Sequence, residues 1–238
     1  MAYELHYWPT IQGRGEFVRL ALEEAGIRYI DVARTDDGED VMLTYLEDAR
    51  VTRPPFAPPF LKAGKLIIAQ TANILLFLGE RHGLAPATTS GRLWTHQLQL
   101  TIADLVAEVH DTHNPITSSL YYEDQKREAK RRAHYLIKER LPKYLGYFEH
   151  VLERNPRGRN CLVGATLTYA DLSAYQVVAG LAYAFPKAMA RLGKRHPNLM
   201  RLHARVAVRP RIAAYLASER RIANNEDDIF RLYPELDE

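Results

Sequence analysis

The chain has 238 residues, 47% of them hydrophobic, and a formal net charge of +3. This length predicts one large domain or two small ones, with enough apolar residues for real cores, and excludes disorder throughout the chain. Because the charges nearly balance and the basic residues are spread along predicted helices, nucleic acid and anionic membranes are not expected as partners, whereas small anions remain possible.

Cysteine content and the N-terminal segment bound the location of the protein. The single cysteine, Cys161, excludes an intramolecular disulfide and any cysteine-rich zinc site. Residues Met1 to Trp8 lack the charged and apolar regions of a secretory signal, and no apolar run is long enough to span a bilayer. We therefore expect a soluble protein of the cytoplasm.

The first elements form a strand-helix-strand unit. Residues Tyr3 to Trp8 are aromatic and apolar enough for a strand. Apolar residues at helical spacing predict a helix from Gly15 to Ala25, which Gly26 ends as a C-terminal glycine would. Arg28 to Val32 is a second strand, so the two strands should be parallel with a right-handed crossover. A short helix is also expected within residues 41–46.

Two further strands and a helix are predicted between Phe56 and Leu78. A proline is tolerated only at an edge, a start or a bulge of a strand, so Pro58 and Pro59 indicate a sheet end shaped for something other than strand pairing. The bond before Pro59 is a candidate cis peptide bond. A cis-proline exposes backbone groups that an added extended peptide can pair with.

The helix predicted from Gln70 to His82 opens with two polar residues, Gln70 and Thr71. Their side chains lie beside the unpaired backbone N–H groups of the helix start, and together these groups suit a carboxylate. A peptide with a free carboxylate would fit both this feature and the proline pair.

The rest of the chain is predicted to be helical. Leu84 to Ser90 has the small, polar and proline residues of a linker. Beyond it, no strand is evident and Pro142 is expected to start or kink a helix. Helical periodicity predicts a bundle formed by Arg92 to His113, Glu123 to Leu152, Tyr169 to Tyr183 and Leu199 to Leu216.

Two C-terminal features complete the pattern. Thr168 and Asp171 have the spacing of a capping box at the start of an apolar helix, with Leu167 as a candidate hydrophobic staple. We interpret this motif as a structural cap worth about 1 kcal/mol. The tail, residues 224–238, is acidic with apolar residues interspersed, and we expect it to pack on the body of the protein or on a neighbour.

Four motifs, in order and spacing, resemble the landmarks of the cytosolic glutathione transferases. They are Tyr7, Pro59-Phe60-Leu61, Gln70-Thr71, and Gly164 with Thr168-Tyr169-Ala170-Asp171. The resemblance covers essentially the full length and is closest to the tyrosine-using branch (mu, pi and sigma classes). It implies an α/β thioredoxin-like domain with a mixed four-stranded sheet (residues 1–83), a linker (84–90) and an all-α helical bundle (91–238), usually paired as a homodimer.

The resemblance also implies the chemistry of a thiol. Free glutathione titrates near ~8.5, so an enzyme that uses it must stabilise the thiolate. A hydroxyl that donates a hydrogen bond to sulfur contributes ~1.5–3 kcal/mol and lowers the thiol pKa by ~1–2 units. Tyr7 matches the family's catalytic tyrosine. Tyr3 and Thr10 are alternatives, of which Thr10 is the better, because the turn from Pro9 to Arg14 looks one residue longer than in the tyrosine-using branch.

The remaining groups of glutathione imply further site residues. Gln70 and Thr71 match the pair that binds the γ-glutamyl end, and Asp104 matches an acidic residue that reaches the γ-glutamyl amine from the neighbouring subunit. Alternatively, Gln70 and Thr71 only cap the helix, and Asp104 is a solvated carboxylate on a helix. The glycine carboxylate, or the anion in general, has as candidates Arg14, Arg50 and Arg53, all of which could also be plain surface residues.

Pro58 departs from the family pattern. Family members usually have, before the cis-proline, an apolar residue whose backbone pairs twice with the cysteinyl part of glutathione. Pro58 has no N–H to donate. If Pro59 is the matching proline, half of this pairing is lost at a cost of ~0.5–1.5 kcal/mol, so weaker binding or another thiol ligand is expected.

The electrophile should bind between the domains. The candidate residues are Trp8, Thr10, His110, the nearby His113 and Phe230. The histidines resemble a metal motif weakly, and we favour a polar cleft wall or a satisfied histidine pair over a zinc site. Phe56 is either a dimer anchor, as in related enzymes, or part of the local core.

We therefore predict a dimeric glutathione transferase that conjugates the glutathione thiolate to small apolar electrophiles in detoxification, without a metal. A glutathione-dependent isomerase or peroxidase would use the same thiolate. From another class, a non-catalytic glutathione-binding, ligand-binding or structural protein on this fold is the alternative.

Overall fold

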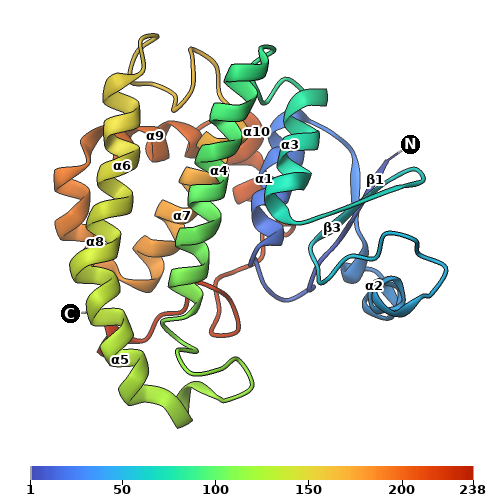
Figure 1. Ribbon diagram of the computed structural model, residues 1–238, viewed down its shortest axis with the longest axis horizontal. Coiled ribbons are helices and arrows are strands. Elements are labelled where there is room, and N and C mark those ends of the chain that lie inside the picture. The colour runs from blue at the N-terminus through green and yellow to red at the C-terminus, as the bar shows by residue number, and fades with distance from the viewer. Residues whose placement is uncertain (1, 238) are drawn as a thin grey trace.

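The computed structural model describes residues 2–237, which form an α/β part and a helical part (Figure 1). The α/β part contains a four-stranded sheet of strand order β2-β1-β3-β4. Its elements in chain order are β1 (Tyr3–His6), α1 (Gly15–Ala25), β2 (Tyr29–Asp31), α2 (Gly38–Glu47), β3 (Phe60–Ala63), β4 (Leu66–Ala69) and α3 (Thr71–Arg81). A short 3-10 turn, Val32–Arg34, follows β2.

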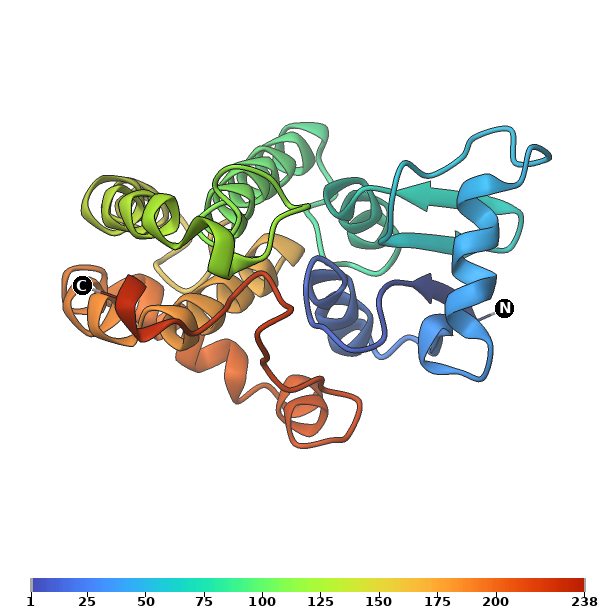
Figure 2. The same ribbon diagram turned by 90° about the horizontal axis from the view of Figure 1, so that it is seen from below.

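The sheet is mixed, as predicted. β1 pairs in parallel with β2, whereas β3 is antiparallel to both β1 and β4. Helices α1 and α3 lie between the sheet and the helical part, and α2 covers the other face (Figure 2). The order of strands and helices confirms the predicted strand-helix-strand unit.

Helix α1 shows how local sequence fixes an element. It spans Gly15–Ala25, as predicted, and Gly26 follows with a φ of 68°. In this left-handed conformation the backbone N–H of Gly26 bonds to carbonyl groups of the last turn, and glycine adopts it without a Cβ penalty. The predicted first strand is shorter than expected, because β1 ends at His6 rather than at Trp8.

The helical part begins inside the predicted linker. Thr88 caps α4 by accepting a 3.2 Å hydrogen bond from the backbone N–H of Gly91. The helices are α4 (Thr89–His110), α5 (Lys126–Tyr135), α6 (Leu141–Arg154), α7 (Tyr169–Ala184), α8 (Pro186–Leu192), α9 (Pro197–Ala207) and α10 (Pro210–Leu216). The shorter turns here are Tyr122–Gln125, Gly193–Arg195 and Pro234–Leu236.

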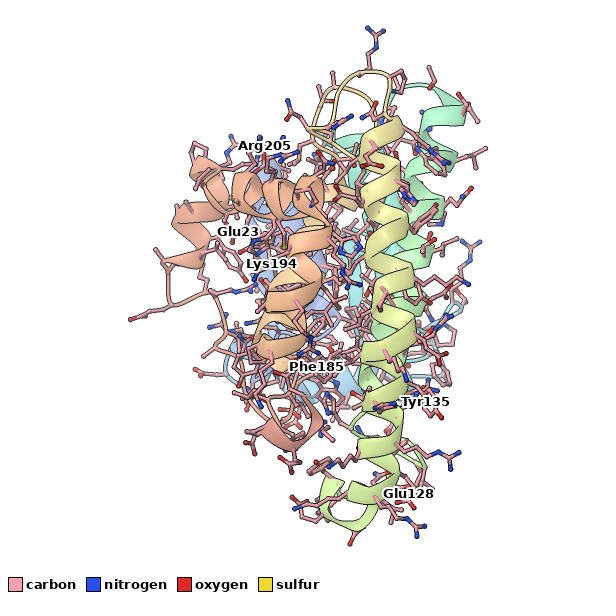
Figure 3. All side chains as sticks on the ribbon, turned by 90° about the vertical axis from the view of Figure 1, so that its left-hand side faces the viewer. Glu23, Glu128, Tyr135, Phe185, Lys194 and Arg205 are labelled. Atoms are coloured by element: carbon pink, nitrogen blue, oxygen red, sulfur yellow. The ribbon has the colours of Figure 1, made fainter. Side chains whose placement is uncertain are left out.

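Helices α5 and α6 follow one another along one irregular helix (Figure 3, where Glu128 and Tyr135 are labelled). A π-helical segment, Leu136–Arg140, joins them, and Pro142 lies in the first turn of α6. Because proline lacks an N–H and its ring displaces the preceding carbonyl groups, a local change of helical pitch here is expected. The predicted role of Pro142 is therefore confirmed.

One helix prediction was wrong, and one helix was not predicted. The segment from Leu199 to Leu216 was expected as one helix, but it is divided into α9 and α10 at Pro210, which begins the second helix. The short α8 was not predicted. It likewise begins with a proline, Pro186, a residue that is favourable in the first helical turn.

The capping box at α7 confirms its prediction. The carboxylate of Asp171 accepts hydrogen bonds from the backbone N–H and the hydroxyl of Thr168, at 2.7 and 2.8 Å. It also accepts a bond from the N–H of Leu162, so one buried group holds both the helix start and the preceding loop. Helix α7 is buried along most of its length in the centre of the helical part.

The C-terminal tail packs on the body of the protein, which is one of the two predicted alternatives. Figure 2 shows it running back from α10 across the face of the helical part. Ile229 and Phe230 are buried, and the ring of Phe230 lies where a Cβ on Gly180 would stand. Among residues 2–237, no helix has the length and apolar content to cross a membrane.

Candidate functional site

The register of the sheet brings three predicted site regions to one end. His6, at the end of β1, pairs with Phe60 at the start of β3, and Phe60 pairs with Ala69 at the end of β4. The adjoining residues, Tyr7, Pro59 and Gln70, are therefore at the same sheet end. The Pro58–Pro59 peptide bond is cis, as predicted, and Pro59 is buried.

Tyr7 is held in a close-fitting environment at this sheet end. Its side chain is 4% exposed, and a Cβ on Gly13 would lie 2.0 Å from its hydroxyl oxygen. That oxygen accepts a 2.9 Å hydrogen bond from the backbone N–H of Arg14, its one hydrogen bond among the described residues. The Tyr7 phenol can lie this close to the backbone of residue 13 only because glycine has no side chain, so Gly13 is required for the position of the phenol.

Burial sets the protonation state of this phenol. Desolvation raises the pKa of Tyr7, against the opposing effects of the Arg14 N–H and the Arg14 guanidinium. The hydroxyl therefore stays protonated at neutral pH. Its oxygen accepts the bond from Arg14, and no bond from its proton to another described residue is seen.

Arg14 connects Tyr7 to the start of α3. The hydroxyl of Thr71 donates a 3.3 Å hydrogen bond to the carbonyl oxygen of Arg14. Gln70 has φ 69° and ψ 120°, a strained conformation for a non-glycine residue of the kind that gathers at functional sites. Arg14, Gln70 and Thr71 all line a cavity of about 360 Å³ between α1, α3 and α4.

The opposite wall of this cavity contains polar residues that the sequence analysis missed. Gln99 is 2% exposed, and neither its side-chain oxygen nor Nδ1 of His96 makes a hydrogen bond to the described residues. A buried polar atom without a partner costs free energy, so these atoms are candidates for contact with a bound polar molecule. Both polar residues interrupt the apolar pattern of α4, and this interruption is the sequence feature from which they could have been predicted.

Three other predicted residues lie apart from this cavity. Arg50 and Arg53 are exposed on the segment after α2, and Arg50 forms a 2.9 Å ion pair with Asp48. Asp104 is exposed on the outer face of α4. Within one chain, the structure therefore does not bring these groups to Tyr7, and any role of Asp104 requires a second subunit.

The two alternative hydroxyl groups differ from Tyr7 in their surroundings. Tyr3, at the far end of β1, is bonded through its hydroxyl to Nε2 of His82 at 2.9 Å. Thr10 is exposed in the turn, and its carbonyl oxygen accepts a 2.8 Å bond from Asn225. Trp8 is half-buried and packs on the small apolar cluster beneath α2 that contains Phe60.

The histidine motif divides into two environments. His110 is half-buried, and burial lowers its pKa against the opposing effect of its hydrogen bond with Asp111. His113 is 1% exposed beside the rings of Phe185 and Tyr233, and burial lowers its pKa to about 3. His113 is thus a neutral core histidine. Within residues 2–237, no three His, Cys, Asp or Glu side chains are grouped to hold a metal ion.

Buried polar contacts that were not predicted join α1 to the helical part and to β2. Glu16, fully buried, accepts a 3.0 Å bond from the hydroxyl of Tyr215 and is paired with Arg221. Arg19, one turn along α1, forms a 2.7 Å ion pair with Asp31. The only sequence signal was the spacing of Glu16 and Arg19 on an otherwise apolar helix.

Comparisons with known proteins agree with this fold. A family model described as "Glutathione S-transferase, C-terminal domain" matches residues 110–219. Glutathione S-transferase P 1 of Xenopus laevis is 28% identical over 221 residues, which cover 92% of this chain and 93% of the relative. A glutathione S-transferase of Plasmodium yoelii yoelii is 26% identical, covering 88% of this chain and 90% of the relative.

Solved structures share the architecture. The pi-class glutathione S-transferase of Onchocerca volvulus superimposes with a TM-score of 0.68 at 23% identity, covering 90% of this chain and 92% of that one. A prostaglandin synthase D of Nilaparvata lugens gives a TM-score of 0.70 at 18% identity, covering 92% and 98%. The predicted thioredoxin-like domain followed by a helical domain is therefore confirmed. Taken with the sequence relatives, these matches show that the chain resembles glutathione transferases, pi-class members among them, over most of its length.

Proposed function

We propose that the protein conjugates the thiolate of glutathione to small apolar electrophiles, as a cytoplasmic homodimer that serves detoxification. The observation that carries this proposal is the placement of Tyr7. Its protonated hydroxyl lies at the sheet end where the cis-proline and the Gln70–Thr71 helix start also lie. Relatives named glutathione S-transferase over most of the chain support the same reaction.

In the proposed reaction, the phenol of Tyr7 donates its proton in a hydrogen bond to the glutathione sulfur. A charge-assisted bond of this kind contributes ~1.5–3 kcal/mol, which lowers the thiol pKa by ~1–2 units. The thiol proton passes to solvent, Tyr7 keeps its own proton, and the thiolate then attacks the electrophilic carbon and forms a carbon–sulfur bond. In a substitution, the leaving group departs with the bonding electrons; in an addition, the new carbanion takes a proton from solvent.

The rest of glutathione would bind at the start of α3. Backbone N–H groups at a helix start favour a carboxylate, and Gln70 with the hydroxyl of Thr71 would add side-chain contacts to the γ-glutamyl end. Arg14, which lines the same cavity, supplies a positive charge. The cysteinyl backbone would find a carbonyl group but no N–H at Pro58, so binding should be weaker than a non-proline residue would give.

A homodimer is supported by an apolar outer surface. Leu93 and Leu100 on α4 are 65% and 48% exposed, and Phe56 is 92% exposed. The exposure of Phe56 excludes the alternative of local core packing and supports its proposed role as an anchor in a partner. Asp104 is exposed on α4 as well, from where it could reach the glutathione of the other subunit.

Pro58 favours a second candidate, a glutathione-binding protein without efficient catalysis. Two measurements separate the candidates: calorimetric binding of glutathione, and turnover of an activated aromatic chloride or a glutathione-dependent isomerase or peroxidase substrate. Saturable binding with conjugation supports the transferase. Binding without any turnover supports the binding protein, and no binding at millimolar glutathione would contradict both.

A further inference from the structure

The C-terminal tail is bonded to the turn that precedes α1. The side chain of Gln12 donates a 2.6 Å hydrogen bond to the carbonyl oxygen of Ile222, and Asn225 donates to the carbonyl oxygen of Thr10. These bonds join residues more than 200 positions apart. The tail residues lie beyond residue 219, where the family match ends.

Asp228 makes the central contacts between this tail and the turn. It is 2% exposed. One carboxylate oxygen accepts bonds from the backbone N–H groups of Gly13 and Ile229, at 2.8 and 2.6 Å. The other accepts a 3.1 Å bond from the N–H of Gln12. A buried carboxylate with three backbone donors is a firm anchor for the segments that supply them.

The next backbone amide along the turn, that of Arg14, contacts the candidate catalytic residue Tyr7. The N–H groups of Gln12 and Gly13 point to Asp228, and the following N–H, that of Arg14, donates to the hydroxyl oxygen of Tyr7. A turn fixed at its first two amides presents the third in a defined direction. Because Gly13 lies so close to the phenol oxygen, a small movement of the turn changes that contact.

We propose that Asp228 is a positioning residue for the thiolate site: it fixes the Gln12–Arg14 turn so that the Arg14 amide holds the Tyr7 hydroxyl in place to donate to sulfur. This role rests on the proposed function. Asp228 does not touch the reacting atoms in this arrangement. It acts through two backbone amides and the phenol.

Electrostatics and positioning predict opposite signs when the charge of Asp228 is removed. A nearby carboxylate disfavours a thiolate, so neutralising it would by charge alone lower the pKa of the bound thiol. Loss of the anchor instead loosens the turn and weakens the bond from Tyr7 to sulfur, which raises that pKa. The direction of the shift therefore separates the two effects.

The matched variants are Asp228→Asn and Asp227→Asn. Asp227 is the exposed neighbour, so its variant removes the same charge one residue away and keeps the anchor. We expect Asp228→Asn to raise the pKa of enzyme-bound glutathione by ~0.5–1 unit, measured by ultraviolet titration of the thiolate at saturating glutathione, and Asp227→Asn to leave it unchanged. An unchanged or lowered pKa in Asp228→Asn would overturn the proposal.

Amide hydrogen exchange in the ligand-free protein tests the anchor without glutathione. In Asp228→Asn the Gly13 and Arg14 amides should exchange at least about tenfold faster than in the wild type and in Asp227→Asn, since their bonds set the local opening energy. Equal rates would overturn the proposal. If the wild type binds no glutathione, the proposed function fails together with the thiolate role, and the exchange rates still report the anchor.

Should Asp228→Asn not fold, Asp228→Glu provides the same comparison. It keeps the charge but displaces both oxygens by one methylene, so charge effects are absent from it. We expect a smaller rise of the bound thiol pKa in the same direction and faster exchange of both amides. Wild-type values for both would contradict a positioning role.

Discussion

The backbone N–H of Arg14 donates a 2.9 Å hydrogen bond to the hydroxyl oxygen of Tyr7. Arg14 directly precedes α1, so the phenol oxygen lies at the positive end of that helix. A sulfur anion bonded to this hydroxyl would lie near the same helix end, which favours negative charge. One backbone amide thus orients the phenol, and the helix adds to the stabilisation of the thiolate.

The hydroxyl of Thr10 should contribute little to thiol activation. Thr10 is exposed, and its side chain makes no hydrogen bond to the described residues, so nothing fixes its direction. We expect Thr10→Ala to keep kcat/KM for conjugation within about threefold of the wild type, a difference of under ~1 kcal/mol. A loss as large as that of Tyr7→Phe in the same steady-state assay would assign activation to Thr10.

The hydroxyl of Thr71 should strengthen glutathione binding. Thr71→Ala removes both its bond to the Arg14 carbonyl and its proposed contact with the γ-glutamyl end. Loss of about 1–1.5 kcal/mol corresponds to a Kd weaker by about 5–13-fold, measurable by calorimetry. Thr71→Ser keeps the hydroxyl and should bind nearly as the wild type does. Equal affinities for the alanine and serine variants would refute this role.

Phe56 should anchor the dimer. An aromatic residue with 92% exposure gains much by burial in a partner, and such an anchor is worth ~2 kcal/mol or more at an interface. We expect Phe56→Ala to weaken dimerisation at least about 25-fold in sedimentation experiments. Val208→Ala, at another exposed apolar residue, is the control and should have no effect. A wild-type dimer in Phe56→Ala would remove Phe56 from the interface.

His113 should make the fold sensitive to acid. Burial lowers the pKa of His113 from 6.5 to about 3, so below pH 6.5 the unfolded chain binds a proton that the folded chain does not. Stability therefore falls as the pH is lowered from 6.5 towards 3. At pH 5 the loss from this residue is about 2 kcal/mol.

The test of that sensitivity is denaturant unfolding at pH 7 and pH 5. His113→Gln cannot titrate, so its free energy of unfolding should decrease between the two pH values by about 2 kcal/mol less than that of the wild type. His150→Gln changes an exposed histidine and should follow the wild type. The same pH dependence in the wild type and His113→Gln would show that His113 is not the acid-sensitive group.

Features with local chemical signals could be predicted from the sequence. Helix α1 and its glycine end follow from apolar spacing and the freedom of Gly26, and the α7 capping box follows from Thr168 and Asp171. The sheet end could also be anticipated, because Pro59 is a residue type that permits a cis peptide bond and Gln70 with Thr71 marks a polar helix start, whereas the positive φ of Gln70 was not predicted.

Contacts between distant segments could not be predicted. Asp228 contacts Gln12 and Gly13, which are more than 200 residues away in the sequence. No local sequence pattern in an acidic tail predicts which residues it contacts. Gln99 is a similar case, since a polar residue within a helix is usually exposed and only the packing of α4 shows that it is buried. The site was therefore predictable at its motifs, whereas the groups that fix those motifs were not.

The most direct test of the role of Tyr7 is the pKa of enzyme-bound glutathione in Tyr7→Phe, with Tyr121→Phe, at a tyrosine that is 80% exposed, as the matched control. Ultraviolet titration should give the wild type and Tyr121→Phe the same lowered thiol pKa, and should give Tyr7→Phe a value ~1–2 units higher, near that of free glutathione. A bound thiol that titrates in Tyr7→Phe as it does in the wild type would contradict the proposed mechanism.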